Sequence, residues 1–212
     1  MILDVEQSLK MCKKHKLPIA ESSVAKTQKQ AVEAGKKLGY PLAMKVISQQ
    51  IIHKTEAGCI KVGVSGEREV AKDFEEIVEN AKKYDKKAKV QGVLLQKMSK
   101  GTELIVGGRK DEQFGQTILL GIGGTMVELY KDYSLRICPI TGQDFEEMLS
   151  ELKTRKVLEG FRGSKPVNKE LLKDLVLKTS EMLLKERIKE LDLNPVIAND
   201  KEVVIADARI IK

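Results

Sequence analysis

Aromatic side chains are scarce in this sequence of 212 residues, which has no tryptophan, four tyrosines and four phenylalanines. Few platforms are therefore available for stacking nucleic-acid bases. The three cysteines, Cys12, Cys59 and Cys138, are widely spaced and form no CxxC pair, so neither a disulfide framework nor a zinc site is predicted. No apolar run is long enough to cross a bilayer, and the first residues lack the pattern of a secretory signal, so we expect a cytoplasmic protein.

Charged residues are abundant, at 33% of the chain against 42% hydrophobic residues, which is typical of a globular protein. The net charge of +7 could attract nucleic acid or phosphorylated small molecules. The densest cluster of lysines, "KKYDKKAK" (82–89), follows a helical pattern. We interpret it as the solvated end of a helix rather than as a nucleic-acid patch.

The first hundred residues predict an initial helix followed by a compact mixed lobe. Asp4 can cap the initial helix. A second helix is predicted over 28–38 and should end at Gly39. In "LAMKVI" (42–47) the alternation of side chains predicts a strand, from which Lys45 projects. The lobe should also contain strands over 59–64 and 90–98, with a helix after Ser65-Gly66 between them.

The chain beyond Ser99 is rich in predicted strands and punctuated by glycine. These strands follow one another without helices, which predicts antiparallel pairing. The expected strands cover 102–111, 116–124, 125–130 and 135–140, followed by helices over 143–160 and 168–187 and by strands over 188–198 and 202–210. We predict an α+β fold with two lobes, 20–97 and 98–212, and with the helix of residues 1–19 packed on the second.

The glycine cluster "GIGGT" contains Gly121, Gly123 and Gly124. Closely spaced glycines let backbone N–H groups approach phosphate oxygens. However, the cluster lacks the GK[ST] ending of a P-loop and the third glycine of a dinucleotide fingerprint. A tight turn between two strands is an equally good interpretation of the cluster by itself.

A pair of oxygen-bearing side chains, Asn194 and Asp207, lies near the end of the chain. A hairpin formed by the last strands would bring these two residues together. Magnesium prefers hard oxygen ligands, often one or two side chains combined with nucleotide phosphates and water. The alternative is that "LNPV" is merely a turn and that Asp207 is a surface residue.

Other residues would suit a nucleotide. Lys45, on its strand, can bind a phosphate as a point charge. The stretch Gln96, Lys97 and Met98 could present backbone groups and an apolar wall to adenine, and Glu103 could accept ribose hydroxyls. Together these residues predict a nucleotide cleft between the two lobes.

Three segments resemble the ATP-grasp beta subunit of ADP-forming acetyl-CoA synthetases: "AMKVISQQIIHKTEAGCIKVGV", the long stretch from "LQKMSKGTELIVGG" to "LRICPI", and "ELDLNPV". The match covers nearly the whole chain. Succinyl-CoA synthetase beta subunits are similar at greater distance, sharing the lysine strand, an E-x-x-x-G step seen here as Glu103 to Gly107, and the NP turn followed by an aspartate. The resemblance implies an ATP-grasp fold with the nucleotide between two α+β lobes.

The resemblance also implies an activity and a partner. A CoA-binding alpha subunit would form acyl phosphate, and its phosphorylated histidine would carry the phosphoryl group to ADP on this chain, in an assembly of two alpha and two beta chains. The reversible net reaction is acyl-CoA, ADP and phosphate giving acid, CoA and ATP. The resemblance assigns Lys45, Gln96, Lys97, Met98 and Glu103 to the nucleotide, Asn194 and Asp207 to magnesium, and Asp192 to orienting the phosphohistidine.

His53, in the family's "HK" step with Lys54, would receive or steer the phosphoryl group, and we favour steering. With Lys45 and Lys54, it would gather positive charge around that group. The other histidine, His15, is interpreted as structural. One departure from the family pattern is Cys59, which follows Gly58 where a second glycine is usual and would add bulk near a phosphate.

Two other functions remain open. A self-sufficient ATP-grasp carboxylate–amine ligase would act without a partner, but the chain is short for it. A non-enzymatic nucleotide-sensing module would not depend on His53, Asn194 or Asp207.

Overall fold

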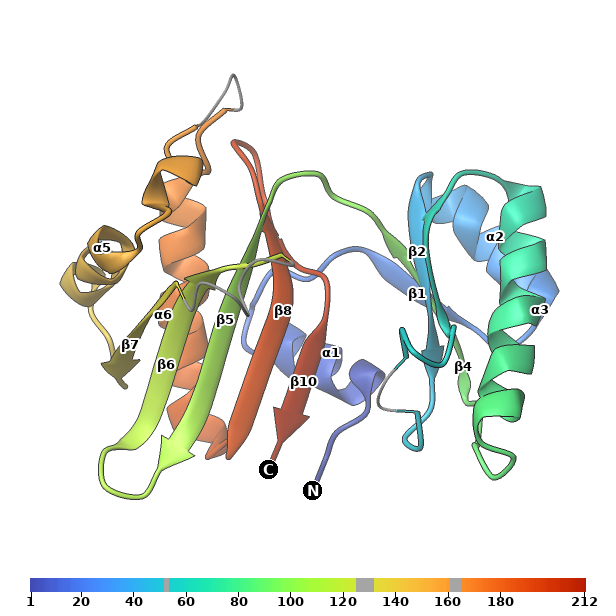
Figure 1. Ribbon diagram of the computed structural model, residues 1–212, viewed down its shortest axis with the longest axis horizontal. Helices are drawn as coiled ribbons and strands as arrows, with labels where there is room; N and C mark the ends of the chain where they lie inside the picture. The colour runs from blue at the N-terminus through green and yellow to red at the C-terminus, as the bar shows by residue number, and fades with distance from the viewer. Residues whose placement is uncertain (52–53, 125–131, 161–164) are drawn as a thin grey trace. The chain divides into compact units, whose positions relative to one another are not determined.

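The structure, a computed structural model, describes residues 1–51, 54–124, 132–160 and 165–212 (Figure 1). It divides into two compact units: a small unit, Ala20–Met98, and a large unit, Met1–Ile19 with Ser99–Lys212. Within the described residues, no helix is both long and apolar enough to span a membrane. The strand predicted over 125–130 lies outside the described residues.

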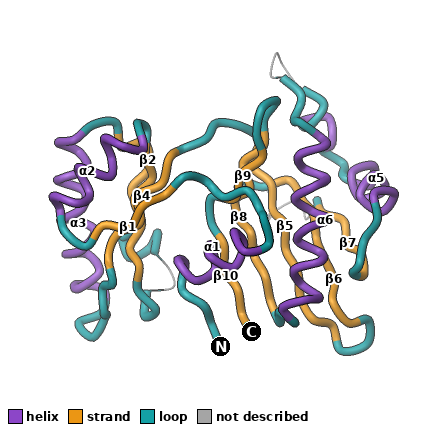
Figure 2. Tube along the Cα trace, turned by 180° about the vertical axis from the view of Figure 1, so that it is seen from behind, coloured by secondary structure: helices purple, strands orange, loops and turns teal. Residues whose placement is uncertain are grey.

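The small unit is a four-stranded antiparallel sheet with two helices on one face (Figures 1 and 2). Its elements are β1 (Ser22–Ala25), α2 (Gln28–Leu38), β2 (Leu42–Ile47), β3 (Ile60–Val64), α3 (Glu67–Tyr84) and β4 (Gly92–Lys97), and the strand order is β1-β4-β2-β3. Leu42, Met44 and Val46 pack in the core with α3. The prediction for α2 is confirmed, since Thr27 caps its start and Gly39 ends it with a φ of 78°.

The large unit contains a six-stranded antiparallel sheet, which confirms the predicted pairing type. Its strands are β5 (Thr102–Asp111), β6 (Gly115–Ile122), β7 (Tyr133–Ile137), β8 (Glu190–Ala198), β9 (Val203–Ile205) and β10 (Ala208–Ile211). The order is β10-β8-β5-β6-β7, and β9 also pairs with β8. Its helices are α1 (Val5–Lys14), α5 (Gly142–Glu151) and α6 (Lys169–Glu186), with a short 3-10 turn, η1 (Arg155–Val157). Figure 2 shows α1 and α6 on the same face of the sheet.

The predicted helix over 143–160 is too long, because α5 ends at Glu151. The backbone then turns toward Asp132, whose carboxylate accepts the N–H groups of Lys153 at 2.8 Å and Thr154 at 2.9 Å. Satisfying these two donors with a carboxylate removes the need for a further helical turn. Because Asp132 is about twenty residues away in the sequence, helical periodicity could not indicate this ending.

The predicted single strand over 202–210 is in fact two strands, β9 and β10. The break falls at Ala206 and Asp207. The Asp207 carboxylate accepts the N–H of Ala208 at 3.0 Å, a local bond that competes with a regular ladder. As a result, β8 pairs with β10 along its first half and with β9 along its second half.

Helix α1 begins as predicted, with Asp4 and Gln7 forming a capping box. Its C-terminal end is held by Glu186, the last residue of α6. The Glu186 carboxylate lies 2.7 Å from Nζ of Lys14, 2.9 Å from Nε2 of His15 and 2.7 Å from Nζ of Lys212. The Glu186 side chain is only 13% exposed. The hydrogen bonds from Lys14, Lys212 and His15 hold the pKa of Glu186 far below its usual range. His15 therefore has the structural contact that was expected of it.

We expect Glu186→Gln to lower the free energy of unfolding at pH 7 by about 1–2 kcal/mol, between the values for exposed and buried ion pairs. Because the native pKa of Glu186 is lowered, its contribution is present above its ordinary pKa of 4.5 and is lost as the pH falls from there toward the native value. Denaturant unfolding at pH 7 and at about pH 3 measures this difference. Glu181→Gln, which removes an exposed i,i+4 pair with Lys185 on the same helix, is the matched control and should change stability little. An equal effect of Glu186→Gln at both pH values would contradict the prediction.

Candidate active site

The switch of β8 from one partner to the other places Asn194 opposite Asp207. The N–H of Asn194 donates to the carbonyl of Asp207 at 3.2 Å, and the N–H of Ala206 donates to the carbonyl of Pro195 at 3.0 Å. Leu193 pairs with Ala208, and this register continues to Asn194 and Asp207. Residues directly opposite each other lie on the same face of a sheet. The structure thus brings together the two residues that the sequence proposed as a pair.

Asp192 belongs to the same cluster. It lies two residues before Asn194 on β8, so both side chains are on one face of the sheet. Burial raises the pKa of the Asp192 carboxyl, and the negative charge of Asp207 raises it further. Arg209, which pairs with Asp192 in the β8–β10 register, has the opposite effect on this pKa. The cluster is an acidic site with one adjacent guanidinium.

Sequence reasoning missed Arg209. Its only signal was its position two residues after Asp207, which puts it on the same face of an extended segment. That signal could be used only if the register of β8 and β10 was known.

Glu103 and the glycine cluster lie side by side at the start of β5 and the end of β6. The N–H of Gly123 donates to the carbonyl of Glu103 at 2.6 Å, and a Cβ at position 123 would come within 2.8 Å of the Glu103 backbone. Gly124 has a φ of 93°, and a Cβ there would lie 3.7 Å from Oε2 of Glu103. Gly123 therefore contributes a close backbone approach rather than an available N–H. Gly121 lies within β6, opposite Ile105.

In the small unit, Lys45 and Gln96 lie on the sheet face opposite to Leu42 and Met44. Gln96 pairs with Ala43, which is two residues from Lys45 on β2, so the ammonium and the amide share a face. Both residues are buried, with exposed fractions of 7% and 2%. Among the described residues, Nε2 of Gln96 has no hydrogen-bond partner. A buried amide donor without an acceptor costs about 1–3 kcal/mol, so this position favours a ligand with an acceptor atom.

The residues next to Gln96 are more accessible. Lys97 is exposed, and Met98 is 37% exposed while its Sδ accepts the N–H of Gly63 at 3.1 Å. Met98 belongs to the small unit, where its N–H donates to the carbonyl of Pro41 at 3.1 Å.

The segment between β2 and β3 is described except for residues 52 and 53, so His53 lies outside the described residues. The carbonyl of Lys54 accepts the N–H of Cys59 at 2.8 Å. The Cys59 thiol is fully buried in the core and donates to the carbonyl of Ala57 at 3.4 Å. Its side chain therefore points into the small unit's core.

These residues form two sets, one in each unit. The acidic cluster, Glu103 and the glycine cluster lie in the large unit, whereas Lys45, Lys54 and the stretch from Gln96 to Met98 lie in the small unit. The nucleotide cleft between the units remains a prediction.

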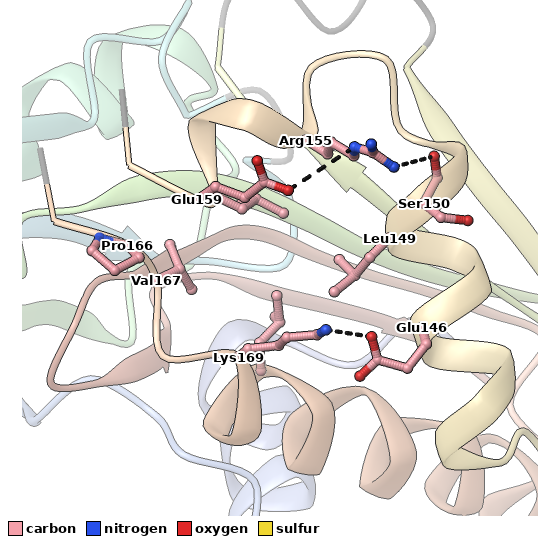
Figure 3. A pocket seen from close by; sticks show the side chains of 10 residues that line it. Glu146, Leu149, Ser150, Arg155, Glu159, Pro166, Val167 and Lys169 are labelled. Atoms are coloured by element: carbon pink, nitrogen blue, oxygen red, sulfur yellow. Dashed lines mark hydrogen bonds and ion pairs between the residues drawn. The ribbon is translucent and has the colours of Figure 1, made fainter. Parts of the chain in front are cut away.

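The large unit also has a cavity of about 370 Å³ that contains none of the predicted site residues (Figure 3). Its apolar lining comes from α5, from α6 and from the segment between these helices, and its charged residues are paired. Lys169 forms an ion pair with Glu146, and Arg155 lies 4.0 Å from Glu159. Because these charges offset each other, the cavity has no bias toward an anion. Within the described part of the chain, no group of three or more His, Cys, Asp or Glu side chains could hold a metal ion by itself.

Comparison with known proteins relates this geometry to a family. The ATP-grasp domain family matches residues 1–211. The chain is 40% identical over 207 residues to the beta subunit of acetate–CoA ligase [ADP-forming] I from Pyrococcus furiosus, covering 97% of this chain and 89% of that subunit. It is 42% identical over 198 residues to 4-hydroxybutyrate–CoA ligase [ADP-forming] from Nitrosopumilus maritimus, of which it spans only 28%.

Solved structures agree with this relationship. An acetyl-coenzyme A synthetase from Ca. Korarchaeum cryptofilum, in complex with coenzyme A and Ca-AMPCP, has a TM-score of 0.94 and 39% identity, covering 99% of this chain and 93% of that one. The same enzyme with Mg-AMPPCP, in which a phosphohistidine segment points towards the nucleotide-binding site, has a TM-score of 0.86 and 36% identity, covering 99% and 92%. The predicted fold class, α+β with the ATP-grasp fold, is confirmed.

The carboxylate cluster makes a testable electrostatic prediction. We expect the pKa of Asp192 to lie above its ordinary value of 3.8 and to fall in Asp207→Asn, because the negative charge of Asp207 is removed while burial remains. Titration of side-chain carboxyl carbons by NMR measures both values. Asp111, whose carboxylate accepts the N–H groups of Phe114 and Gln113 at the far end of β5, is the control and should not change. If Asp207→Asn left the pKa of Asp192 unchanged, the two carboxylates would not interact.

Proposed function

Because the chain belongs to the ATP-grasp family and, within it, to the beta subunits of ADP-forming acetate–CoA ligases, we propose that it is the nucleotide-binding subunit of an ADP-forming acyl-CoA synthetase. It would accept a phosphoryl group from a phosphohistidine of a CoA-binding alpha chain and transfer it to ADP. The observation that carries this proposal is the placement of Asp192, Asn194 and Asp207 on one face at the β8 partner switch.

The donor set at this switch fits a magnesium ion. One amide oxygen and one carboxylate stand opposite each other, and Mg²⁺ commonly takes one or two protein oxygens together with phosphate oxygens and water. When bound, Mg²⁺ would neutralise part of the charge on the nucleotide phosphates. The Korarchaeum enzyme solved in complex with Mg-AMPPCP supports magnesium as the ion that accompanies the nucleotide.

The small unit would hold the nucleotide from its own sheet. The buried Lys45 would bind a phosphate, and the Nε2 of Gln96 would donate to an acceptor on the nucleotide. Backbone groups of Lys97 and the side chain of Met98 would face the adenine. In the large unit, Glu103 would accept ribose hydroxyls, and the adjacent Gly121, Gly123 and Gly124 would allow the phosphates to approach the backbone.

Transfer of the phosphoryl group from the phosphohistidine to ADP needs no further reactant. The P–N bond of the phosphohistidine breaks, and its electron pair returns to the imidazole nitrogen. An oxygen of the terminal ADP phosphate forms the new P–O bond, which gives ATP. Asp192 would orient the incoming imidazole, and His53 with Lys45 and Lys54 would steer the phosphoryl group by positive charge. The partner would complete an assembly of two alpha and two beta chains.

Replacing a proposed metal ligand tests the function. We expect Asn194→Ala and Asp207→Ala to weaken Mg-ADP binding by about tenfold or more, since each removes an oxygen ligand. Isothermal calorimetry measures the affinity, and thermal unfolding confirms that the variants fold. The control is Asp200→Ala. Asp200 lies in the turn between β8 and β9, where its carboxylate pairs with Lys165, and its loss should leave the affinity unchanged. In the complex with the CoA-binding chain, formation of ATP from acetyl-CoA, ADP and phosphate should fall in parallel.

Two results would overturn this function. Unchanged Mg-ADP affinity in both variants, with no ATP formed by the wild-type chain together with the CoA-binding chain, would favour a nucleotide-sensing module. ATP-dependent ligation by the purified chain alone would favour a self-sufficient carboxylate–amine ligase.

The role proposed for His53 has its own test. In a single-turnover reaction with the phosphorylated CoA-binding chain and Mg-ADP, His53→Ala should slow ATP formation by about 100-fold or more, a typical effect of losing a positioned transfer group. His15→Gln, at the only other histidine, should transfer at the wild-type rate. Radiolabel trapped on His53 would indicate a covalent intermediate rather than steering, and a wild-type rate for His53→Ala would exclude both roles.

A further inference from the structure

Strand β7 turns its apolar side chains to solvent. Tyr133, Leu135 and Ile137 are 44%, 49% and 53% exposed, whereas Ser134 between them is buried. In an antiparallel sheet with helices on one face, apolar residues normally point toward the helices and polar residues toward solvent. The alternation along β7 is the reverse of this rule.

Polar contacts to α5 hold β7 in this orientation. Nη2 of Arg136 lies 2.6 Å from Oε1 of Glu151, and the Ser134 hydroxyl also donates to Glu151. The Arg136 guanidinium and the Ser134 hydroxyl lower the pKa of Glu151 to about 2, so this ion pair is charged at physiological pH. A slip of β7 by one residue would bury the apolar side chains but would break these contacts. The exposed apolar face is therefore a specified feature of the fold.

The apolar face continues across the sheet to the candidate active site. Leu135 pairs with Leu119 on β6, Leu119 with Gly107 on β5, and Gly107 with Asp192 on β8. Because Gly107 has no side chain, none stands between Leu119 and Asp192 in this row. We call Tyr133, Leu135, Ile137 and Leu119 the apolar strip.

The strip lies on the face of the sheet away from the helices. A Cβ at Gly108 would come within 2.5 Å of Leu183 on α6, so Gly108 faces that helix and Gly107 faces the opposite side. Figures 1 and 2 show α6 on only one side of these strands. Exposed apolar side chains grouped on one surface, as Tyr133, Leu135 and Ile137 are here, are typical of a protein-binding site.

We propose that the apolar strip is the docking surface for the CoA-binding chain, at the part of that chain that carries the phosphorylated histidine. This inference rests on the proposed function, in which the histidine must reach Asp192. The row that starts at Leu135 reaches Asp192 and then Arg209 on β10, so a chain bound to the strip lies in line with the Asp192 carboxylate. A second copy of this chain on the strip would instead cover the approach to Asp192. The occupant must cover the apolar strip and must also bring a histidine to Asp192. The chain that delivers the phosphoryl group does both.

The test uses Leu135→Lys. Among the described strands β7 lies at the edge of the sheet, where lysine is well tolerated, but a lysine there disrupts an apolar interface. We expect the Kd for the separately purified CoA-binding chain of the same organism to rise by about thirtyfold, as for a central interface residue. Mg-ADP affinity and the melting temperature of the isolated variant should not change. ATP formation should recover when the CoA-binding chain is added in excess, which separates a docking defect from a catalytic one.

The matched control is Leu184→Lys, because Leu184 is a 38% exposed leucine on α6, on the helix-covered side of the sheet. It should leave the Kd unchanged. Wild-type affinity of Leu135→Lys for the CoA-binding chain would overturn the docking proposal alone. The docking proposal would also fail if the wild-type chain sedimented as a dimer by itself and Leu135→Lys as a monomer, since the strip would then be a self-interface. Failure of the wild-type chain to bind the CoA-binding chain would overturn the proposed function as well.

Discussion

The candidate site depends on the pairing of β8, which binds β5 along one edge and two successive strands, β10 and β9, along the other. The change of partner occurs at Asn194 and Asp207, where their backbones share a hydrogen bond. Because the pairing on both sides of this point is antiparallel and regular, Asp192, Asn194 and Asp207 all fall on one face. A shift of β10 by one residue would separate the amide from the carboxylate and bury one of them.

The two faces of the large sheet differ, because helices cover one of them and the candidate site lies on the other. One face is closed by α1 and α6, with buried leucines of β8 such as Leu191 and Leu193 beneath them. The other face has the acidic cluster on β8 and, two strands away, the apolar strip on β6 and β7. Gly107 and Gly108 illustrate the division, since one faces the open side and the other fits against Leu183 of α6. Chemistry and partner recognition, as proposed, therefore share a surface that the hydrophobic core does not use.

The sheet of the small unit also has one face covered by helices and one face that carries candidate site residues. Its helices bury Leu42, Met44 and Val46, while the opposite face carries Lys45 and Gln96, both largely removed from water. Burying an amide donor that lacks an acceptor is unfavourable unless a ligand compensates. In the proposed function, the nucleotide would supply the missing acceptor.

The sequence by itself determined the local elements and the family. Thr27 and Gly39 bound α2, Asp4 begins α1, and the motifs around Lys45, Glu103 and Asn194 are sufficient to indicate an ATP-grasp protein. These signals are local, since caps, periodicity and short motifs depend on neighbouring residues.

Only the tertiary structure decided the features that depend on residues far apart in the sequence. Asp132 ends α5 early, Arg209 stands beside Asp192 through the β8–β10 register, and Glu151 turns the apolar side of β7 outward. In each case the geometry of a strand or helix is set by a contact with a residue that is distant in the sequence. The energy of that contact exceeds the weak local preference it opposes, so pattern alone could not predict it.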